Sequence, residues 1–302
     1  MSTTAEVDST APTPTTPSDY DDLRTSKRRK MTPTRVLLYA FLTAMSLLWL
    51  FPVVWALYNS FRDYDFTSEN GYVSFGGFTM DNYTNAWSQG NFTQLFLNSA
   101  IIVVPAVFFT LVFSTLAAFV LSRFSFWFNL PMLILFTAAN LLPQQSLLIP
   151  LFRFFREVGL LDNYLSVILV HIAFQTGFCT FVLSNFMKAL PHSLTEAALV
   201  DGASVWRQYW QIILPLCRPS LAALTVLQVT WIYNDFFWAV AFLNSGDKFP
   251  ITSGLQNLRG QFFTDYNLLS AGSILVAVPT IVVFFALQKQ FVSGLTLGSD
   301  NG

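Results

Sequence analysis

The sequence contains few charged residues. Only 11% of its 302 residues are Asp, Glu, Lys or Arg, whereas 53% are hydrophobic and 17% aromatic, with 32 Phe. Soluble domains carry roughly 25% charged residues, so this composition indicates a protein that crosses a membrane several times. The formal net charge of −1 excludes the basic surface of a nucleic-acid-binding protein, and no nucleic acid partner is predicted.

Residues that perform chemistry are also scarce. The two cysteines, Cys179 and Cys217, lack metal-ligand spacing and are predicted to be packing residues. The two histidines, His171 and His192, are too far apart to indicate a metal site or a triad. None of the five lysines follows a Gly-x-x-x-x-Gly-Lys-Ser/Thr loop, so the chain should not bind ATP through a P-loop. We therefore predict no catalytic residue, no metal and no cofactor in the chain itself, which is not expected to be an enzyme.

The N-terminal residues 1–35 differ from the rest. Ser, Thr and Pro dominate, followed by an acidic patch and then the basic run Lys27–Lys30. Such a stretch buries almost nothing, and a disordered cytoplasmic tail is predicted. The apolar run that follows, Val36–Tyr58, is too long for the core of a signal peptide, and no small-residue cleavage site follows it. It is predicted to be a first spanning helix that starts inside.

Six apolar runs are long enough to cross a hydrocarbon layer of ~30 Å, which takes about 20 helical residues. They are Val36–Tyr58, Asn98–Leu121, Phe128–Phe152, Tyr164–Met187, Ser220–Leu243 and Leu268–Gln288. With both termini in the cytoplasm, inner segments hold eleven Lys and Arg and outer segments hold five, in agreement with the positive-inside rule. The prediction is an all-α membrane protein with a six-helix transmembrane domain over residues 36–298 and a C-terminal tail over 299–302.

The connector at residues 188–219 is a moderately polar segment between the fourth and fifth predicted spans. Ser193 and Glu196 have the spacing of a capping box, so a short helix is predicted to begin at Ser193. Gly202 would end that helix in a left-handed turn, and Ser204 could cap a second helix. The sequence therefore predicts a helix–turn–helix elbow at the cytoplasmic membrane surface.

The elbow carries a recognisable order: Glu-Ala-Ala, three residues, Gly, nine residues, Ile-x-Leu-Pro. This order resembles the EAA loop of ABC importer permeases. The residues concerned are Glu196, Ala197, Ala198, Asp201, Gly202, Ile212, Leu214 and Pro215. The resemblance implies a coupling helix that docks into a cleft on a separate ATPase subunit. The alternative is an ordinary amphipathic connector in which Glu196 only caps its own helix.

Other segments are similar to the carbohydrate permeases related to the maltose transporter. They are residues 78–83, 97–99, 121–124, 148–152, 159–164, 231–238 and 288–296. The resemblance implies a multi-pass permease in a bacterial or archaeal plasma membrane, surrounded by lipid. Its implied partners are a second permease, two ATPase subunits that bind ATP and Mg, and an extracytoplasmic binding protein that delivers a mono-, di- or oligosaccharide. The alternatives are an ion-coupled secondary transporter, or an ABC importer of a non-sugar solute such as polyamine or glycerol phosphate.

Polar residues within predicted spans are costly and are therefore candidates for a substrate pathway. In the fifth span these are Gln228, Trp231, Asn234, Asp235 and Trp238, and in the third span Asn140 and Gln144, with His171 and Gln175 one turn apart in the fourth. On a continuous helix, the offsets from Gln228 to Trp238 would keep four of them within roughly 80° of one another. Amide, carboxylate and indole groups suit a sugar. Alternatively, these groups bond to a neighbouring helix.

Overall fold

The computed structural model describes residues 32–259 and 264–296, which fall into two units that meet after Val53. The first unit contains most of helix α2 (Pro33–Ser60), whose apolar side chains are exposed. This helix begins three residues before the predicted first span. Most of the predicted N-terminal tail, residues 1–31, and the predicted C-terminal tail, residues 299–302, lie outside the described residues. Residues 33–35 of the predicted N-terminal tail belong to α2, so the tail ends earlier than predicted.

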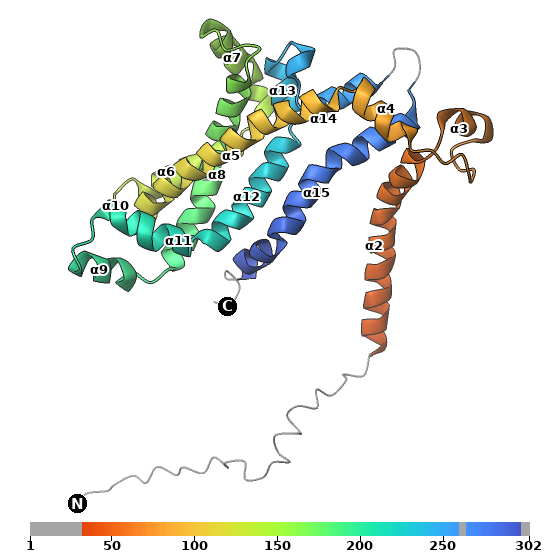
Figure 1. Ribbon diagram of the computed structural model, residues 1–302. Coiled ribbons are helices and arrows are strands. Elements are labelled where there is room, and N and C mark those ends of the chain that lie inside the picture. The colour runs from red at the N-terminus through yellow and green to blue at the C-terminus, as the bar shows by residue number, and fades with distance from the viewer. Residues whose placement is uncertain (1–31, 260–263, 297–302) are drawn as a thin grey trace, which may run out of the picture. The chain divides into compact units, whose positions relative to one another are not determined.

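The second unit is built from helices. Apart from one isolated bridge between Arg62 and Phe78, the described residues contain no β structure, which confirms the all-α prediction for this part of the chain (Figure 1). The α-helices after α2 are α3 (Tyr64–Asn70), α4 (Asp81–Gln89), α5 (Phe92–Arg123), α6 (Asn129–Ala139), α7 (Gln144–Glu157), α8 (Tyr164–Ala189), α9 (Ser193–Val200), α10 (Val205–Gln208), α11 (Leu214–Leu216), α12 (Arg218–Tyr233), α13 (Phe237–Phe242), α14 (Ile251–Gly254) and α15 (Tyr266–Thr296). A π-helical turn, η1 (Tyr209–Ile213), and two 3₁₀ turns, η2 (Gly246–Lys248) and η3 (Leu255–Leu258), complete the list.

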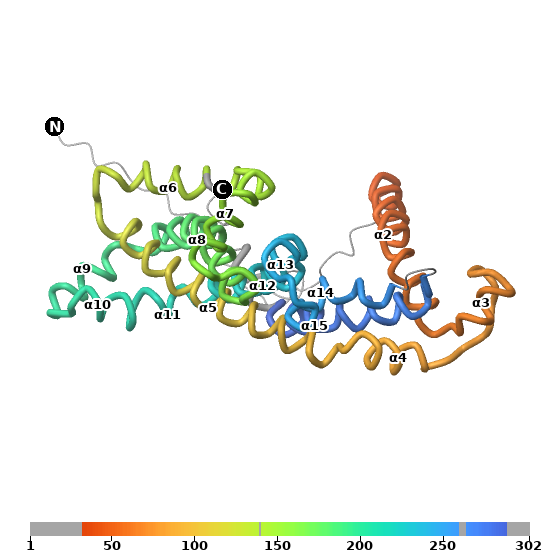
Figure 2. The backbone as a smooth tube through the Cα atoms, turned by 90° about the horizontal axis from the view of Figure 1, so that it is seen from above, coloured from red at the N-terminus to blue at the C-terminus, as the bar shows by residue number. Residues whose placement is uncertain are grey.

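The centre of this unit is the pair α5 and α8, and α12 packs on α15 (Figures 1 and 2). Small polar side chains lie in the interior of the α5–α8 contact, including Ser114 on α5 and Thr180 on α8, both fully buried. The Ser114 hydroxyl donates to the carbonyl of Thr176 across the pair, at 3.1 Å. Small residues allow two helix backbones to approach closely, which is how helices associate where no water drives them together.

Two apolar cores flank this contact. The first surrounds Phe92, Trp238 and Phe242, near the start of α5. The second surrounds Leu183 and Met187 near the end of α8, and it includes Cys179 and Cys217. Both cysteines are buried and free, which confirms them as packing residues.

The long connector before α5 is ordered by a buried arginine. The Arg62 guanidinium is fully buried and donates to the carbonyls of Gly76 (3.1 Å) and Tyr72 (2.6 Å) and to the hydroxyl of Ser74 (2.6 Å). It also lies over the ring of Tyr58, 5.1 Å from the centroid. Buried charge requires such a set of acceptors, and these bonds give the segment a defined fold.

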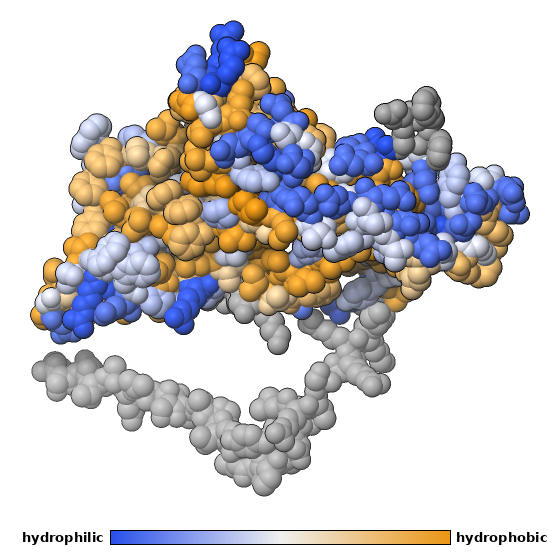
Figure 3. All heavy atoms as spheres, turned by 45° about the horizontal axis from the view of Figure 1, so that its top comes forward, coloured by the Kyte–Doolittle hydropathy of each residue, from blue (hydrophilic) through white to orange (hydrophobic). Residues whose placement is uncertain are grey.

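Four described helices, α2, α5, α8 and α15, are long and apolar enough to cross a membrane, and a fifth span results if Val205–Leu216 and α12 are joined across their 72° bend. Much of the left and centre of the face in Figure 3 is covered by apolar side chains, with hydrophilic ones at the top, at the lower left and in a band toward the right. Large exposed apolar residues on α5, α6 and α15 include Phe108, Ile134 and Phe285. In a membrane protein such side chains face lipid.

The third and fifth predicted spans are not continuous helices, which corrects the prediction. The third divides into α6 and α7, and the fifth into α12 and α13. At the first break, Pro143 has no backbone N–H and so cannot donate the hydrogen bond that would extend α6. Proline also disfavours helical backbone at the residue before it, Leu142. At the second break the Asn234 side chain donates to the carbonyl of Thr230 at 2.8 Å, so a side chain competes with the helical hydrogen bonds.

Candidate functional site

The elbow contains the turn that its glycine predicts. Gly202 has φ 73°, its N–H donates to the carbonyl of Leu199 at 3.0 Å, and the N–H of Ala203 donates to that of Ala198 at 2.9 Å. This pair of bonds is the Schellman motif that ends a helix at a left-handed glycine. The hydroxyl of Ser204 then accepts from the N–H of Arg207 at 3.3 Å and caps α10. The left-handed Gly202 and the Ser204 cap are therefore confirmed.

The prediction of a capping box at the start of α9 is wrong. Helix α9 begins at Ser193 as predicted, but the preceding residue, His192, already has helical dihedrals, and no side chain caps this end. The carboxylate of Glu196 is exposed, and within the described part of the chain it has no hydrogen bond or ion pair. The cap by Glu196 that the alternative assumed is therefore absent, and the coupling helix stays a prediction.

The two halves of the elbow are held differently. After Gly202, the hydroxyls of Tyr209 and Thr115 of α5 lie 2.7 Å apart, and Ile213 is fully buried in the second core. In α9 only Ala198 is buried, while Leu199 and Val200 are 67% and 88% exposed. A hollow of about 680 Å³ lies between α9 and the α10–η1 segment.

The predicted coupling residues divide along the same line. Glu196, Ala197, Asp201 and Gly202 are exposed, Ala198 is buried, and Ile212, Leu214 and Pro215 are half-buried. The π-helical turn η1 lies inside the motif, between α10 and α11. Such turns are frequent at functional sites. The motif thus presents its first half to the outside and is anchored to the spans through its second half.

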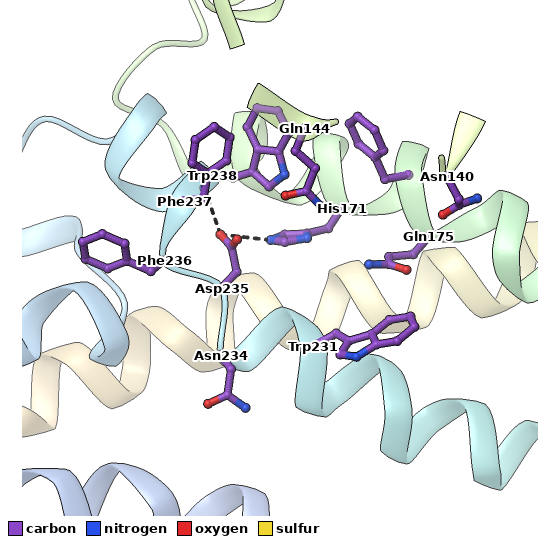
Figure 4. A pocket seen from close by; sticks show the side chains of 11 residues that line it. Asn140, Gln144, His171, Gln175, Trp231, Asn234, Asp235, Phe236, Phe237 and Trp238 are labelled. Carbon is purple, nitrogen blue, oxygen red and sulfur yellow. Dashed lines mark hydrogen bonds and ion pairs between the residues drawn. The ribbon is translucent and has the colours of Figure 1, made fainter. Parts of the chain in front are cut away.

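A polar cavity of about 560 Å³ lies between the two helix breaks (Figure 4). Its lining residues are Asn140, Gln144, His171, Phe174, Gln175, Trp231, Asn234, Asp235, Phe236, Phe237 and Trp238. They come from the α6–α7 break, the middle of α8 and the α12–α13 break. Backbone outside regular helices is tolerated at membrane depth where it lines such a cavity.

Asp235 holds the second break in place. Its Oδ2 accepts from the N–H groups of Trp238 (3.1 Å) and Ala239 (3.3 Å) and so caps α13. The same oxygen lies 3.6 Å from Nε2 of His171 on α8 (Figure 4). The carbonyl of Asp235 accepts from the hydroxyl of Thr252 at 2.7 Å. One residue thus connects α13, α8 and α14.

Eight of the nine predicted pathway residues line this cavity, and Gln228 does not. The Gln228 side chain is fully buried, and its Nε2 lies 3.2 Å from Sγ of Cys179, so it bonds to a neighbouring helix. The argument from a shared helical face was wrong, because α12 ends at Tyr233. The bend after that residue, rather than helical periodicity, brings Trp231, Asp235 and Trp238 together.

The aromatic residues of the cavity have separate roles. The Trp238 ring is 1% exposed and stacks on Phe174 and Phe242, with centroids 5.7 and 5.4 Å apart. Trp231 is 44% exposed and contributes an open indole face. Sequence reasoning missed Phe174, Phe236 and Phe237, since apolar side chains in a span look the same whether they face lipid or a cavity.

A second polar network, here called the polar clamp, lies at the start of α8. The Asp162 carboxylate accepts from the N–H groups of Asn244 (2.9 Å) and Ser245 (3.0 Å), the Ser245 hydroxyl (2.6 Å) and Nζ of Lys248 (2.6 Å). Hydrogen bonds from Lys248 and Ser245 hold the pKa of Asp162 well below its usual range. The hydrogen bond to Asp162 raises the pKa of Lys248. Only the sequence 159–164, similar to the permease family, pointed to this region.

The polar clamp extends to α5 through Asn98. The fully buried Asn98 amide donates to the carbonyls of Asp247 (2.7 Å) and Phe249 (2.9 Å). Its oxygen accepts from the Tyr164 hydroxyl at 2.8 Å. The clamp therefore ties α5, α8 and the segment after α13 into one block next to the cavity.

Two relatives match over most of their own length. A probable ABC transporter permease of Pyrococcus horikoshii is 32% identical over 256 residues, covering 83% of this chain and 92% of the relative. The diacetylchitobiose uptake system permease protein of Streptomyces coelicolor is 30% identical over 263 residues, covering 86% and 87%. Both are membrane transport proteins.

A solved structure has the same fold. It is a chain of a bacterial ABC transporter involved in the import of the acidic polysaccharide alginate, with a TM-score of 0.75, 22% identity and coverage of 85% of this chain and 95% of the other. The family model described as "Binding-protein-dependent transport system inner membrane component" matches residues 110–296, which include α8, the elbow, the cavity and α15. The chain therefore belongs to the family of inner membrane components of binding-protein-dependent transport systems.

Proposed function

We propose that this chain is a non-catalytic permease subunit of an ATP-driven importer and that its cavity lies on the path of a sugar. The observation that carries the proposal is the cavity between the two helix breaks, where amides, one carboxylate and an open indole face meet. Sugars require hydrogen bonds at their rim and an apolar surface for their faces. A relative named for the uptake of diacetylchitobiose supports the same cargo class.

In this proposal the chain has six spans with both termini in the cytoplasm. The third span is formed by α6 and α7 together and the fifth by α12 and α13, each with its break at the cavity. Broken helices also form binding sites near the membrane midplane in secondary transporters. The elbow, residues 188–219, then lies in the cytoplasm of a bacterium or archaeon, where a soluble subunit can reach it.

The proposed partners are a second permease, two ATPase subunits that hold ATP and Mg, and an extracytoplasmic sugar-binding protein. The chain contributes the coupling helix α9, whose unpartnered Glu196 and exposed Leu199 and Val200 are available to a cleft on the ATPase. Since α9 is tied to the spans through Tyr209 and Ile213, a displacement of the elbow would be passed to α12 and from there to the break at Asp235. Binding at the two sites would be coupled reciprocally.

Purification of the tagged chain from its native membrane tests this function. We expect a second permease and an ATPase to co-purify, and the assembled complex in lipid vesicles should take up a sugar only with internal ATP and the external binding protein. The isolated chain should transport nothing down an ion gradient. Uptake by the chain alone would support the secondary-transporter alternative and contradict the proposal.

A further inference from the structure

The lining of the cavity contains one acidic side chain and neither Lys nor Arg. Among its eleven lining residues, Asp235 is the only Asp, Glu, Lys or Arg. The other polar side chains are four amides and the imidazole of His171. Acidic sugars are held most strongly by Arg or Lys, whose N–H groups pair with carboxylates. The lining in the described part of this chain offers no such group.

His171 presents a polar atom to this cavity. The residue is 5% exposed, and its buried Nε2 has no hydrogen-bond partner among the described residues. The Asp235 carboxylate lies 3.6 Å away, beyond hydrogen-bond distance. Figure 4 shows the two side chains pointing toward each other at the cavity wall. Buried polar atoms are nearly always paired, so this nitrogen marks a position for a polar group of a ligand.

The chemistry of the pair favours a hydroxyl. A hydroxyl can accept from the N–H of an imidazole and donate to a carboxylate at the same time. A ligand carboxylate or phosphate has no proton to donate to Asp235, and its charge would be repelled. We propose that His171 and Asp235 share one sugar hydroxyl and that the cavity therefore selects uncharged sugars against acidic ones. This inference rests on the proposed function of the cavity as a sugar path.

Sugar binding to the assembled importer tests the inference. Saturation-transfer NMR titrations would use maltotriose, diacetylchitobiose and lactose as uncharged probes and trigalacturonate as the acidic probe, without the binding protein. We expect at least one uncharged probe to bind and trigalacturonate to bind at least about tenfold more weakly, because like charges brought together are strongly unfavourable.

Four variants separate the effect of charge from that of structure. Asp235→Asn keeps the cap of α13, because Asn caps helices as well as Asp, and should shrink the ratio of uncharged to acidic affinity by about tenfold. His171→Ala should weaken uncharged sugars by up to about tenfold, the loss of one hydrogen bond, and His171→Gln should recover part of that loss. Asp247→Asn removes an exposed carboxylate outside the cavity and should leave the ratio unchanged.

The outcomes distinguish failure of the charge selection from failure of the proposed sugar path. Equal affinity for trigalacturonate and an uncharged sugar would overturn the charge selection alone. So would an Asp235→Asn variant whose ratio of uncharged to acidic affinity equals that of the wild type. Binding of none of the three uncharged sugars would contradict the sugar path itself.

Discussion

The elbow and the polar clamp lie at opposite ends of α8 and are built in opposite ways. At the clamp, Asn98 and Asp162 make short hydrogen bonds to the segment that follows α13. At the elbow, α9 buries only the side chain of Ala198, and its C-terminal end leads into the left-handed turn at Gly202. Dense polar bonding makes one end a rigid block, whereas the other end is free to contact a partner. A conformational signal can therefore enter at α9 without loosening the frame of the cavity.

The largest effect is expected where the elbow turns. Gly202→Val places a β-branched side chain at φ 73°, and a left-handed backbone costs a residue with a Cβ roughly 1–2 kcal/mol. The altered turn should displace α9, so the ATPase should no longer co-purify and uptake should be lost while the protein stays in the membrane. Gly159→Val is the matched control, because Gly159 has φ 72° and, like Gly202, open space around its Cα. Loss of the ATPase in both variants would assign the effect to strain alone.

Asn98→Ala tests the polar clamp, the other region of the comparison. The change removes the two hydrogen bonds from Asn98 to the carbonyls of Asp247 and Phe249, and a typical hydrogen bond contributes about 0.5–1.5 kcal/mol. We expect a clearly lower thermal midpoint in detergent with the ATPase still bound. Asn85→Ala, at an exposed position on α4, should change neither. A variant that keeps its midpoint but loses the ATPase would contradict the division of roles between the two ends.

Asp162→Asn gives a smaller effect that depends on pH. The depressed pKa of Asp162 means that its carboxylate stabilises the fold above the unfolded pKa of about 3.9, and this contribution is lost as pH falls through the folded pKa. Lys248, with its raised pKa, stabilises below its unfolded pKa of about 10.4 and loses that effect as pH rises through the folded value. Thermal midpoints of wild type and variant should therefore differ most near pH 7 and converge in strong acid. A difference that persists unchanged at the lowest pH would show that the ion pair is not its cause.

The smallest effect is expected for Tyr209→Phe. This change removes only the hydroxyl contact with Thr115, worth about 1 kcal/mol, and keeps the ring in the second core. ATPase binding should persist, with a slightly lower ratio of sugar imported to ATP hydrolysed. The Thr115 hydroxyl keeps the hydrogen bond that it donates to the carbonyl of Val112 at 2.9 Å, so the change leaves it with a partner. A full loss of ATPase binding would mean that the anchored half of the elbow also contacts the partner.

The sequence predicted the elbow more accurately than the cavity. Gly202 and Ser204 act within four residues of their own position, so their dihedrals and hydrogen bonds can be inferred locally. The cavity depends on Asn140, His171 and Asp235, which come from three separate segments. Sequence reasoning named these side chains but placed Gln228 with them, because it assumed one uninterrupted helix. The exposed or buried state of Glu196 was likewise not readable from its spacing.

By itself the sequence determined the membrane class, the helical content and the left-handed turn of the elbow. These follow from apolar run length and from the dihedral freedom of single residues, which are local properties. Tertiary structure decided where the helices break and which polar groups meet. At the second break Asp235 accepts a hydrogen bond from the backbone N–H of Trp238, and Asn234 donates one to the carbonyl of Thr230, beside the cavity that the packed helices leave. The energy of a break in a span depends on what surrounds it, and that is known only after the helices have packed.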